Sequence, residues 1–259
     1  LINLLSKHPK VKIVNLCATK NLGKRISFFD KRIKKKLPKI SPIKKIDWSN
    51  LDLVFLSLPN GEAQKIIKKT FNKFKHLKYI DLSADFRINN PKIYKENYKR
   101  KHLAIKLIKN SLYSISELSK EKIKNYRIIA NPGCYPTSIQ IPLIPLLKKK
   151  FINTKSVTID SKSGYSGAGK NLKKKFPHKN IFSSIHAYGI YKHRHTSELD
   201  QEFSKISKSK INYVFIPHLI PTFRGMLSSI YLQLNKNVSI NKIYKVLKKN
   251  HKKNYFVRI

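Results

Sequence analysis

The segment Asn131-Pro132-Gly133-Cys134-Tyr135-Pro136-Thr137-Ser138 joins a predicted strand to a predicted helix and decides how we interpret the fold. The preceding residues 127–130 are strand-like, and residues 139–147 after it form a long apolar segment. Proline and glycine end the strand, and Thr137 or Ser138 supplies a capping hydroxyl. We therefore expect Cys134 at a helix start, where the helix dipole and unpaired N–H groups favour a thiolate. A small buried residue in a turn is the alternative interpretation.

Composition describes a folded protein with an unusually high positive charge. The length of 259 residues is enough for one large domain or two ordinary ones. The hydrophobic content of 41% can build a core and argues against a disordered polycation. The net charge of +43 suggests nucleic-acid binding, but the basic residues are almost all Lys and are spread from Lys7 to Lys253. Because Arg suits base and phosphate recognition better, we expect only non-specific adhesion at low salt and no specific nucleic-acid partner.

The cysteines and the two ends of the chain indicate its surroundings. Cys17 and Cys134 give no disulfide framework and suit a reducing compartment, so a cytoplasmic location is expected. No apolar run approaches the roughly 18 residues that span a membrane, and no signal peptide is found. Leu1 to Ser6 are typical of the end of a helix, and Phe256 to Ile259 of the start of a strand. We therefore expect a fragment that lacks both termini.

The first half alternates between predicted strands and helices, which indicates βαβ units. Strands are expected at 11–17, 51–58 and 78–83, a helix begins at Glu62, and residues 26–50 are interpreted as an irregular excursion. Ligands of such sheets bind beyond the carboxyl ends of the strands. The segments expected around one crevice are therefore Pro59 to Gly61, Ser83 to Arg87 and Asn131 to Cys134. A salt bridge within the loop is the alternative role for Asp85 and Arg87.

The residues after the first strand bear on the nucleotide that this half would bind. An acidic residue there binds the ribose of NAD, whereas basic and hydroxyl groups accommodate the 2′-phosphate of NADP. Thr19, Lys20, Lys24 and Arg25 fit NADP, although a chain so rich in Lys also produces such a cluster by chance.

The second half lacks the βαβ rhythm and is predicted to be an α+β unit. Strands are expected at 156–162, 212–216 and 227–234 and a helix at 240–247, with 217–221 interpreted as a kinked connection. The glycine-rich segment from Ser163 to Lys170 can present N–H groups to an anion or form a flexible turn.

A pair of histidines precedes a predicted helix in this half. Thr196 or Ser197 is expected to cap that helix, and its dipole would keep His195 neutral, as a general base requires. A metal site at His193 and His195 is a poor alternative, because no second cluster of ligands has suitable spacing.

These segments together resemble the N-acetyl-γ-glutamyl-phosphate reductase family, which is related to aspartate-semialdehyde dehydrogenase. The motifs that carry the resemblance are residues 82–87, 132–137 and 163–169, His193-Arg194-His195 with Glu198, and Pro217-His218-Leu219 followed by Arg224-Gly225. The resemblance implies an α/β fold with two domains. Residues 1–133 would form a Rossmann-type NADP-binding domain, incomplete without its first strand and glycine-rich turn. Residues 134–259 would form an α+β catalytic and dimerisation domain of the semialdehyde dehydrogenase type.

The resemblance also implies an activity, namely the NADPH-dependent reduction of N-acetyl-L-glutamyl 5-phosphate to N-acetyl-L-glutamate 5-semialdehyde in arginine biosynthesis. Phosphate would leave as a thioester forms on Cys134, His195 would transfer the proton, and His193 would contact the substrate. Substrate binding is expected from Arg87, Ser163, Gly164, Arg194 and Arg224, and cofactor binding from Thr19, Lys20, Lys24, Pro59, Ser83 and Gly167. A homo-oligomer, either a dimer or a tetramer, is expected, with no membrane partner.

Two alternatives remain open. A homologous reductase acting on a carrier-protein-linked aminoadipyl or glutamyl phosphate would need a basic docking face, but this chain is basic throughout, so charge does not discriminate. A basic nucleic-acid-binding protein is the alternative from another class, and competition by unrelated polyanions would assign such binding to composition.

Overall fold

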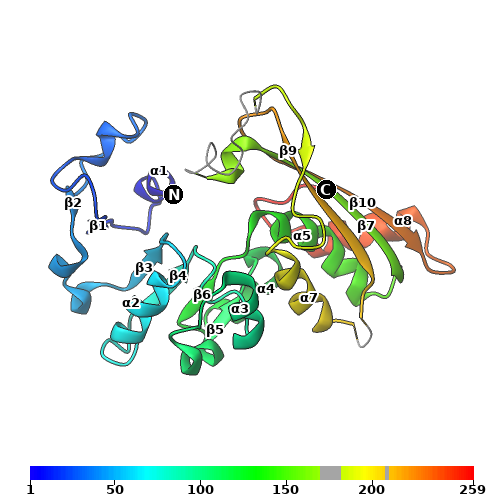
Figure 1. Cartoon of the computed structure of the whole chain (residues 1–259), viewed down its shortest axis with the longest axis horizontal. Helices are drawn as coiled ribbons and strands as arrows, with labels where there is room; N and C mark the ends of the chain where they lie inside the picture. Colours follow the sequence, from blue (N-terminus) through cyan, green and yellow to red (C-terminus); the bar gives the residue numbers. More distant parts are fainter. Residues whose placement is uncertain (170–181, 208–209) are drawn as a thin grey trace. The chain divides into compact units, whose positions relative to one another are not determined.

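The computed structural model of the chain describes residues 1–169, 182–207 and 210–259 (Figure 1). The chain separates into two compact units, Leu1–Asp52 and Leu53–Ile259, and the second unit holds both large sheets. The domain boundary expected between residues 133 and 134 stays a prediction. Lys170, at the end of the predicted glycine-rich segment, lies outside the described residues.

The first unit is irregular, as predicted for residues 26–50. Its strands β1 (Leu16–Cys17) and β2 (Ile40–Ser41) pair in parallel. The strand expected over 11–17 forms only at its last two residues, because only these pair with β2. The helices of this unit are α1 (Ile2–Ser6) and the short 3-10 helices η1 (Ile26–Phe28), η2 (Ile43–Lys45) and η3 (Trp48–Asn50).

A four-stranded parallel sheet opens the second unit, in the order β3-β4-β6-β5. Its strands are β3 (Leu53–Leu56), β4 (Lys78–Asp81), β5 (Ser111–Tyr113) and β6 (Ile128–Ala130). The helices between them are α2 (Glu62–Thr70), α3 (Pro91–Tyr98), η4 (Ile105–Asn110) and α4 (Ser116–Ile123). The predicted βαβ alternation is confirmed, and all four strands end at the same edge of the sheet.

A mixed four-stranded sheet follows, in the order β10-β7-β9-β8. Strand β10 is antiparallel to β7, β9 is parallel to β7, and β8 is antiparallel to β9. The elements of this part are α5 (Cys134–Lys148), β7 (Ile152–Gly164), η5 (Tyr165–Ala168), β8 (His186–Ala187), α7 (Thr196–Ser204), β9 (Tyr213–Ile220), β10 (Met226–Leu234) and α8 (Ile240–His251).

Helix α5 lies against this sheet and anchors the main core (Figure 1). Ile139 and Leu143 of α5 pack in one cluster with Ile159 of β7 and Leu199 of α7. All four side chains are buried, and full burial of such a side chain stabilises the fold by about 1.5–3 kcal/mol. These contacts hold α5 against the mixed sheet and α7.

Two sequence-based expectations about this half are wrong. The segment 217–221 is not a kinked connection, because β9 continues through Pro217 to Ile220. The last residues, 256–259, do not form a strand. Pro217 is tolerated inside β9 because its carbonyl faces Tyr188, just after the end of the short strand β8, so its missing N–H also lies on that side.

Candidate active site

Cys134 is the first residue of α5, directly after the turn that leaves β6, as predicted. Gly133 is the N-cap, with extended backbone, and its carbonyl accepts both the N–H (3.0 Å) and the hydroxyl (2.8 Å) of Thr137. The backbone N–H groups of Cys134 and Tyr135 donate to the Cys134 sulfur. The residue is solvent-exposed, so the thiol is accessible to a small molecule.

The expectation that this position favours a thiolate is wrong for the chain without substrate. Desolvation by the surrounding protein raises the pKa of the Cys134 thiol, although the two N–H groups and Arg87 lower it. Because the residue is exposed to solvent, the sulfur keeps part of its hydration, and we expect a smaller rise than for a fully buried thiol. Cys134 is therefore a thiol at neutral pH and needs a base to become a nucleophile.

Both histidines of the predicted pair are neutral at pH 7. Burial, reinforced by the nearby His193 and Arg194, lowers the pKa of His195 to about 2, and burial lowers the pKa of His193 to about 4. The predicted neutral state of His195 is confirmed, but its largest cause is burial and not the helix dipole. His195 itself, and not Thr196 or Ser197, occupies the N-cap position of α7.

The Nδ1 atoms of the two imidazoles differ in their hydrogen bonding. Nδ1 of His193 accepts the backbone N–H of His195 at 3.1 Å. Nδ1 of His195 is buried and has no hydrogen-bond partner within the described part of the chain. The other ring nitrogen of His195, Nε2, lies beside Gly133 and is 3.8 Å from Glu198 Oε1.

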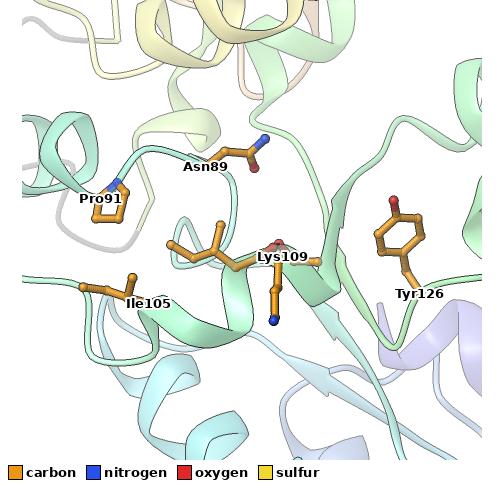
Figure 2. Close-up of a pocket in the computed structure, with 7 residues that line it drawn as sticks. Asn89, Pro91, Ile105, Lys109 and Tyr126 are labelled. Atoms are coloured by element: carbon orange, nitrogen blue, oxygen red, sulfur yellow. Dashed lines mark hydrogen bonds between the residues drawn. The ribbon is translucent and has the colours of Figure 1, made fainter.

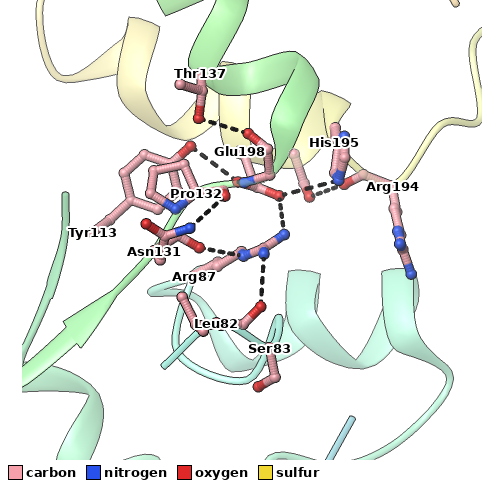
Figure 3. A network of polar contacts seen from close by, with 12 residues as sticks. Leu82, Ser83, Arg87, Tyr113, Asn131, Pro132, Thr137, Arg194, His195 and Glu198 are labelled. Atoms are coloured by element: carbon pink, nitrogen blue, oxygen red, sulfur yellow. Dashed lines mark hydrogen bonds and ion pairs between the residues drawn. The ribbon is translucent and has the colours of Figure 1, made fainter. Parts of the chain in front are cut away.

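A buried polar network surrounds Glu198 and reaches Asn131, on the turn before α5 (Figure 3). At its centre the Glu198 carboxylate, which is fully buried, accepts from Arg87 Nη1 (3.2 Å), the Tyr113 hydroxyl (3.0 Å) and the Gly133 N–H (2.9 Å). Glu198 belongs to the histidine motif, but its sequence position alone predicted no role for it. No sequence motif pointed to Tyr113. It lies 85 residues before Glu198, too far along the chain for a local pattern to connect the two.

Arg87 is only 8% exposed and is held by three acceptors. Its Nε donates to the Asn131 carbonyl (2.8 Å) and its Nη2 to the Leu82 carbonyl (3.3 Å), in addition to the ion pair with Glu198. The structure thus places Arg87 between the ends of β4 and β6 (Figure 3). The substrate-binding role of Arg87 stays a prediction. Only guanidinium N–H groups that do not donate to these three acceptors could bind a substrate.

Asp85 fixes the turn between β3 and α2. The carboxylate is buried and accepts from the N–H groups of Gly61 (2.6 Å) and Gln64 (3.2 Å) and from the Tyr94 hydroxyl (3.0 Å). The salt bridge considered for Asp85 and Arg87 does not form, since each has other partners. The N-terminus of α2 is therefore occupied by a carboxylate of the chain itself.

Ser83 is likewise engaged inside its own loop. Its hydroxyl donates to Asp81 (2.6 Å) and accepts the Asp85 N–H (3.2 Å). Burial raises the pKa of Asp81 to about 6, against the opposing effect of its hydrogen bonds from Ser83 and Phe86. Pro59, by contrast, is exposed just after β3. The Ser83 N–H also donates to Asp81 (2.9 Å), so a contact of Ser83 with a cofactor would use its carbonyl.

The end of β7 explains the glycines of the glycine-rich segment. A β-carbon on Gly164 would lie 2.8 Å from the Thr222 carbonyl oxygen and 2.9 Å from the Arg224 nitrogen, and one on Gly167 would lie 2.6 Å from the Ser163 hydroxyl. Ser163 and Gly164 are buried, so the start of this segment is a packed corner, whereas Gly167 and Gly169 are exposed. Arg224 is exposed beside the Phe223 ring.

Arg194 is exposed between the two histidines, and its side chain points away from the Arg87–Glu198 pair (Figure 3). In the first unit, Thr19 and Lys20 lie in an exposed bend after β1. Lys24 lies over the Phe28 ring and, with Arg25 and Ser27, lines a hollow of about 480 Å³.

A second hollow, of about 470 Å³, lies in the other unit (Figure 2). It is lined by Asn89, Pro91, Ile105, Ile108, Lys109, Ser111 and Tyr126. None of the predicted site residues is among them, so this hollow is separate from the Cys134 site.

Within residues 1–169, 182–207 and 210–259, no group of three or more His, Cys, Asp or Glu side chains could hold a metal ion. Over the same residues, no helix has both the length and the apolar character needed to cross a bilayer.

Two family models together match most of the chain. Residues 1–126 match the semialdehyde dehydrogenase NAD binding domain, and residues 134–259 match the semialdehyde dehydrogenase dimerisation domain. Solved structures show the same fold at low identity. Aspartate semialdehyde dehydrogenase II from Vibrio cholerae superposes with a TM-score of 0.65 at 16% identity, covering 96% of this chain and 74% of that one. The Candida albicans enzyme solved with NADP gives 0.59 at 18% identity, covering 96% and 72%.

Relatives of closer sequence carry a single name. The N-acetyl-gamma-glutamyl-phosphate reductases of Afipia carboxidovorans and Ehrlichia ruminantium are 39% and 42% identical over the whole chain, which spans 74% and 75% of their lengths. A probable chloroplastic reductase of the same name from Arabidopsis thaliana is 39% identical, and the chain spans 64% of it. A cysteine at a helix start, the mixed sheet and these matches agree: the chain belongs to the N-acetyl-gamma-glutamyl-phosphate reductase family of oxidoreductases, within the semialdehyde dehydrogenases.

Proposed function

We propose that the chain catalyses the reduction of N-acetyl-L-glutamyl 5-phosphate to N-acetyl-L-glutamate 5-semialdehyde, as in arginine biosynthesis. The acyl phosphate, NADPH and a proton are consumed, and the aldehyde, inorganic phosphate and NADP are released. The observation that carries this proposal is the exposed Cys134 thiol at the start of α5, on the turn that packs against the neutral imidazole of His195. A cysteine so placed can form a thioester, which divides a difficult reduction into two easier steps.

In the first step Cys134 must lose its proton, because its pKa is raised. His195 is the base, since its ring packs against Gly133, the residue directly before Cys134. Binding of the dianionic acyl phosphate beside the ring raises the pKa of His195 and so makes proton transfer to it easier. The thiolate then attacks the acyl carbon, the bond to the phosphate oxygen breaks, and inorganic phosphate leaves.

The residues around the sulfur stabilise negative charge that develops on the acyl oxygen. The N–H groups of Cys134 and Tyr135 already point at the sulfur, and a tetrahedral intermediate on it would lie within their reach. The N–H of Gly133 is not available, because Glu198 accepts it. After reduction of the thioester, collapse of the hemithioacetal releases the aldehyde and returns the thiolate, which recovers its proton.

The anionic groups of the substrate require positive charge. Arg194 and Arg224 are exposed, and their guanidinium groups suit the bidentate binding of a phosphate and a carboxylate. Ser163 and Gly164 shape the corner at the end of β7, and His193 contacts the substrate through the nitrogen that does not accept the His195 N–H. The contribution of Arg87 is limited to the N–H groups that the protein leaves unused.

The residues after β1 fit a 2′-phosphorylated nucleotide. Lys24 and Arg25 offer two cations, Ser27 a hydroxyl and Phe28 an aromatic face, and no carboxylate lines the same hollow. Thr19 and Lys20 are exposed just before it. Contacts of Pro59, Ser83 and Gly167 with the cofactor stay predictions. When bound, NADPH supplies the hydride that reduces the thioester carbonyl.

We further propose that the chain assembles as a homo-oligomer, because one family model describes its second half as a dimerisation domain. The apolar residues Leu227 and Tyr231 of β10 are 60% and 62% exposed on one face of the mixed sheet and would pack against a second copy. A cytoplasmic location, expected from the two free cysteines, is also a proposal, and two plant relatives are named chloroplastic.

The test of this function is the phosphate-dependent reduction of NADP with N-acetylglutamate semialdehyde. We expect Cys134→Ser to lower kcat by about 10⁴-fold or more, whereas the matched control Cys17→Ser keeps it. Wild-type turnover in Cys134→Ser would contradict the thioester mechanism. Activity confined to a carrier-protein-linked substrate, with none on the free N-acetyl compound, would assign the chain to the alternative reductase.

A further inference from the structure

The two oxygens of the buried Glu198 carboxylate have different partners. Oε1 faces Arg87 Nη1 at 3.2 Å and Nε2 of His195 at 3.8 Å. Oε2 accepts the Gly133 N–H at 2.9 Å and the Tyr113 hydroxyl at 3.0 Å. With no exposed surface and all these donors around it, the carboxylate has no lone pair directed to solvent. A substrate could not reach Glu198 without displacing one of them.

The contacts of Oε2 connect two points of the same helix. Gly133 is the N-cap of α5, and Gln140 lies about two turns further along it, where its Nε2 donates to the Tyr113 hydroxyl at 2.9 Å. The chain of hydrogen bonds therefore runs from Gln140 through Tyr113 and Glu198 back to Gly133. Tyr113, Gln140 and Glu198 are all buried, so water does not compete for these bonds.

Arg87 fixes the other side of the same turn. Its Nε donates to the carbonyl of Asn131, three residues before Cys134, and its Nη2 to the carbonyl of Leu82. The backbone before the nucleophile is thus held at Asn131 by the guanidinium and at Gly133 by the carboxylate (Figure 3). The ion pair between Arg87 and Glu198 holds these two supports together.

We propose that Glu198 is a positioning residue of the reductase: paired with Arg87 and Tyr113, it holds the Gly133 amide and thereby the backbone that presents Cys134. The kinetic part of this proposal rests on the proposed function, whereas the structural part does not. A displacement of about 1 Å at a reacting group costs on the order of 100-fold in rate, so even a partial release of the turn should lower kcat. Because the carboxylate does not touch substrate, KM should change little.

Tyr113→Phe is the first test, because it removes one donor to Glu198 and leaves the charges unchanged. We expect kcat to fall about tenfold with KM within about twofold, and the Gly133 amide to exchange its hydrogen about tenfold faster. The matched control is Tyr79→Phe, which removes another buried hydroxyl contact, the one with Thr70 at 2.8 Å. In that variant kcat and the exchange of Gly133 should equal those of the wild type.

Glu198→Gln is the second test. It removes the carboxylate charge, and the pKa of the Cys134 thiol shows whether that charge acts on the nucleophile. In a Cys17→Ser background, the rate of Cys134 alkylation by iodoacetamide is measured against pH. Removal of the carboxylate charge should shift the pH of half-maximal alkylation rate to a lower value, because Glu198 raises the pKa of that thiol and Arg87 lowers it. Tyr113→Phe should leave this pH unchanged.

Unchanged Gly133 exchange and kcat in Tyr113→Phe would overturn the proposal. So would a rise in KM with unchanged kcat, which would make Glu198 a substrate-binding group. Hydrogen exchange and alkylation do not require turnover. If the wild type lacks the proposed reductase activity while both measurements behave as expected, the reaction assignment fails and the positioning role of Glu198 stands.

Discussion

Gly133 and His195 approach so closely that a β-carbon on the glycine would lie 2.7 Å from Cε1 of the imidazole and nearer still to Nε2. The contact joins the residue before the nucleophile to the proposed base. Gly133 has extended backbone that any residue can adopt, so the requirement for glycine here comes from the His195 ring and not from the backbone.

We expect Gly133→Ala to displace His195, to destabilise the fold by about 1–3 kcal/mol and to lower kcat on the order of 100-fold. Urea unfolding and steady-state kinetics measure both effects. In a His195→Ala background the ring is absent, so the same substitution should cost less than about 0.5 kcal/mol. Equal costs in the two backgrounds would show that the ring is not the obstacle.

The buried neutral state of His195 predicts acid destabilisation. Its pKa is about 2 in the folded chain and near 6.5 in an unfolded one, so the unfolded chain binds more protons between these values. Its contribution to stability is present above pH 6.5 and is lost as the pH falls. Between pH 6.5 and 5 the wild type should lose about 1.6 kcal/mol more unfolding free energy than His195→Asn. Parallel pH profiles would contradict the burial of a neutral ring.

Asp85 is expected to be a structural carboxylate of the β3–α2 turn. Asp85→Ala leaves the N–H groups of Gly61 and Gln64 and the Tyr94 hydroxyl without their acceptor, which should cost about 2–4 kcal/mol in urea unfolding. The control Asp52→Ala, at an exposed residue, should lie within about 0.5 kcal/mol of the wild type. A small effect in both variants would mean that water replaces the carboxylate at the helix start.

The proposed oligomer depends on the exposed face of the mixed sheet. The double substitution Leu227→Lys and Tyr231→Lys places two charges on that face, so sedimentation velocity should show a smaller species than the wild type. The control Ile240→Lys, at a residue of α8 that is 78% exposed, should leave the assembly unchanged. An unchanged sedimentation coefficient in the double variant would locate the interface elsewhere.

Sequence reasoning succeeded where a local pattern determines the structure. The apolar run at 51–58 contains β3, and the Pro-Gly break before Cys134 marks the start of α5. The helix expected to begin at Glu62 is α2, which begins at that residue. Strand β5 was missed, because Ser111 to Tyr113 is too short and mixed to stand out from its neighbours.

Sequence reasoning failed where distant segments meet. Arg87 and Glu198 are 111 residues apart, and no spacing rule predicts that the arginine meets a carboxylate of the chain. The raised pKa of Cys134 was missed for the same reason: the helix start is a local feature, but desolvation depends on the whole surroundings. The many Lys residues did not affect this outcome, because the acidic residues of the site, Asp81, Asp85 and Glu198, are buried.

The Arg87–Glu198 pair also bears on how the chain can be divided. Arg87 precedes and Glu198 follows the boundary expected at residues 133 and 134, so a cut there would leave a buried guanidinium in one piece and a buried carboxylate in the other. Breaking a buried pair by removing one partner typically costs about 3–5 kcal/mol. Neither half should therefore fold as well alone as in the joined chain, and exchange of either half between relatives should succeed only when the Arg and the Glu are both kept.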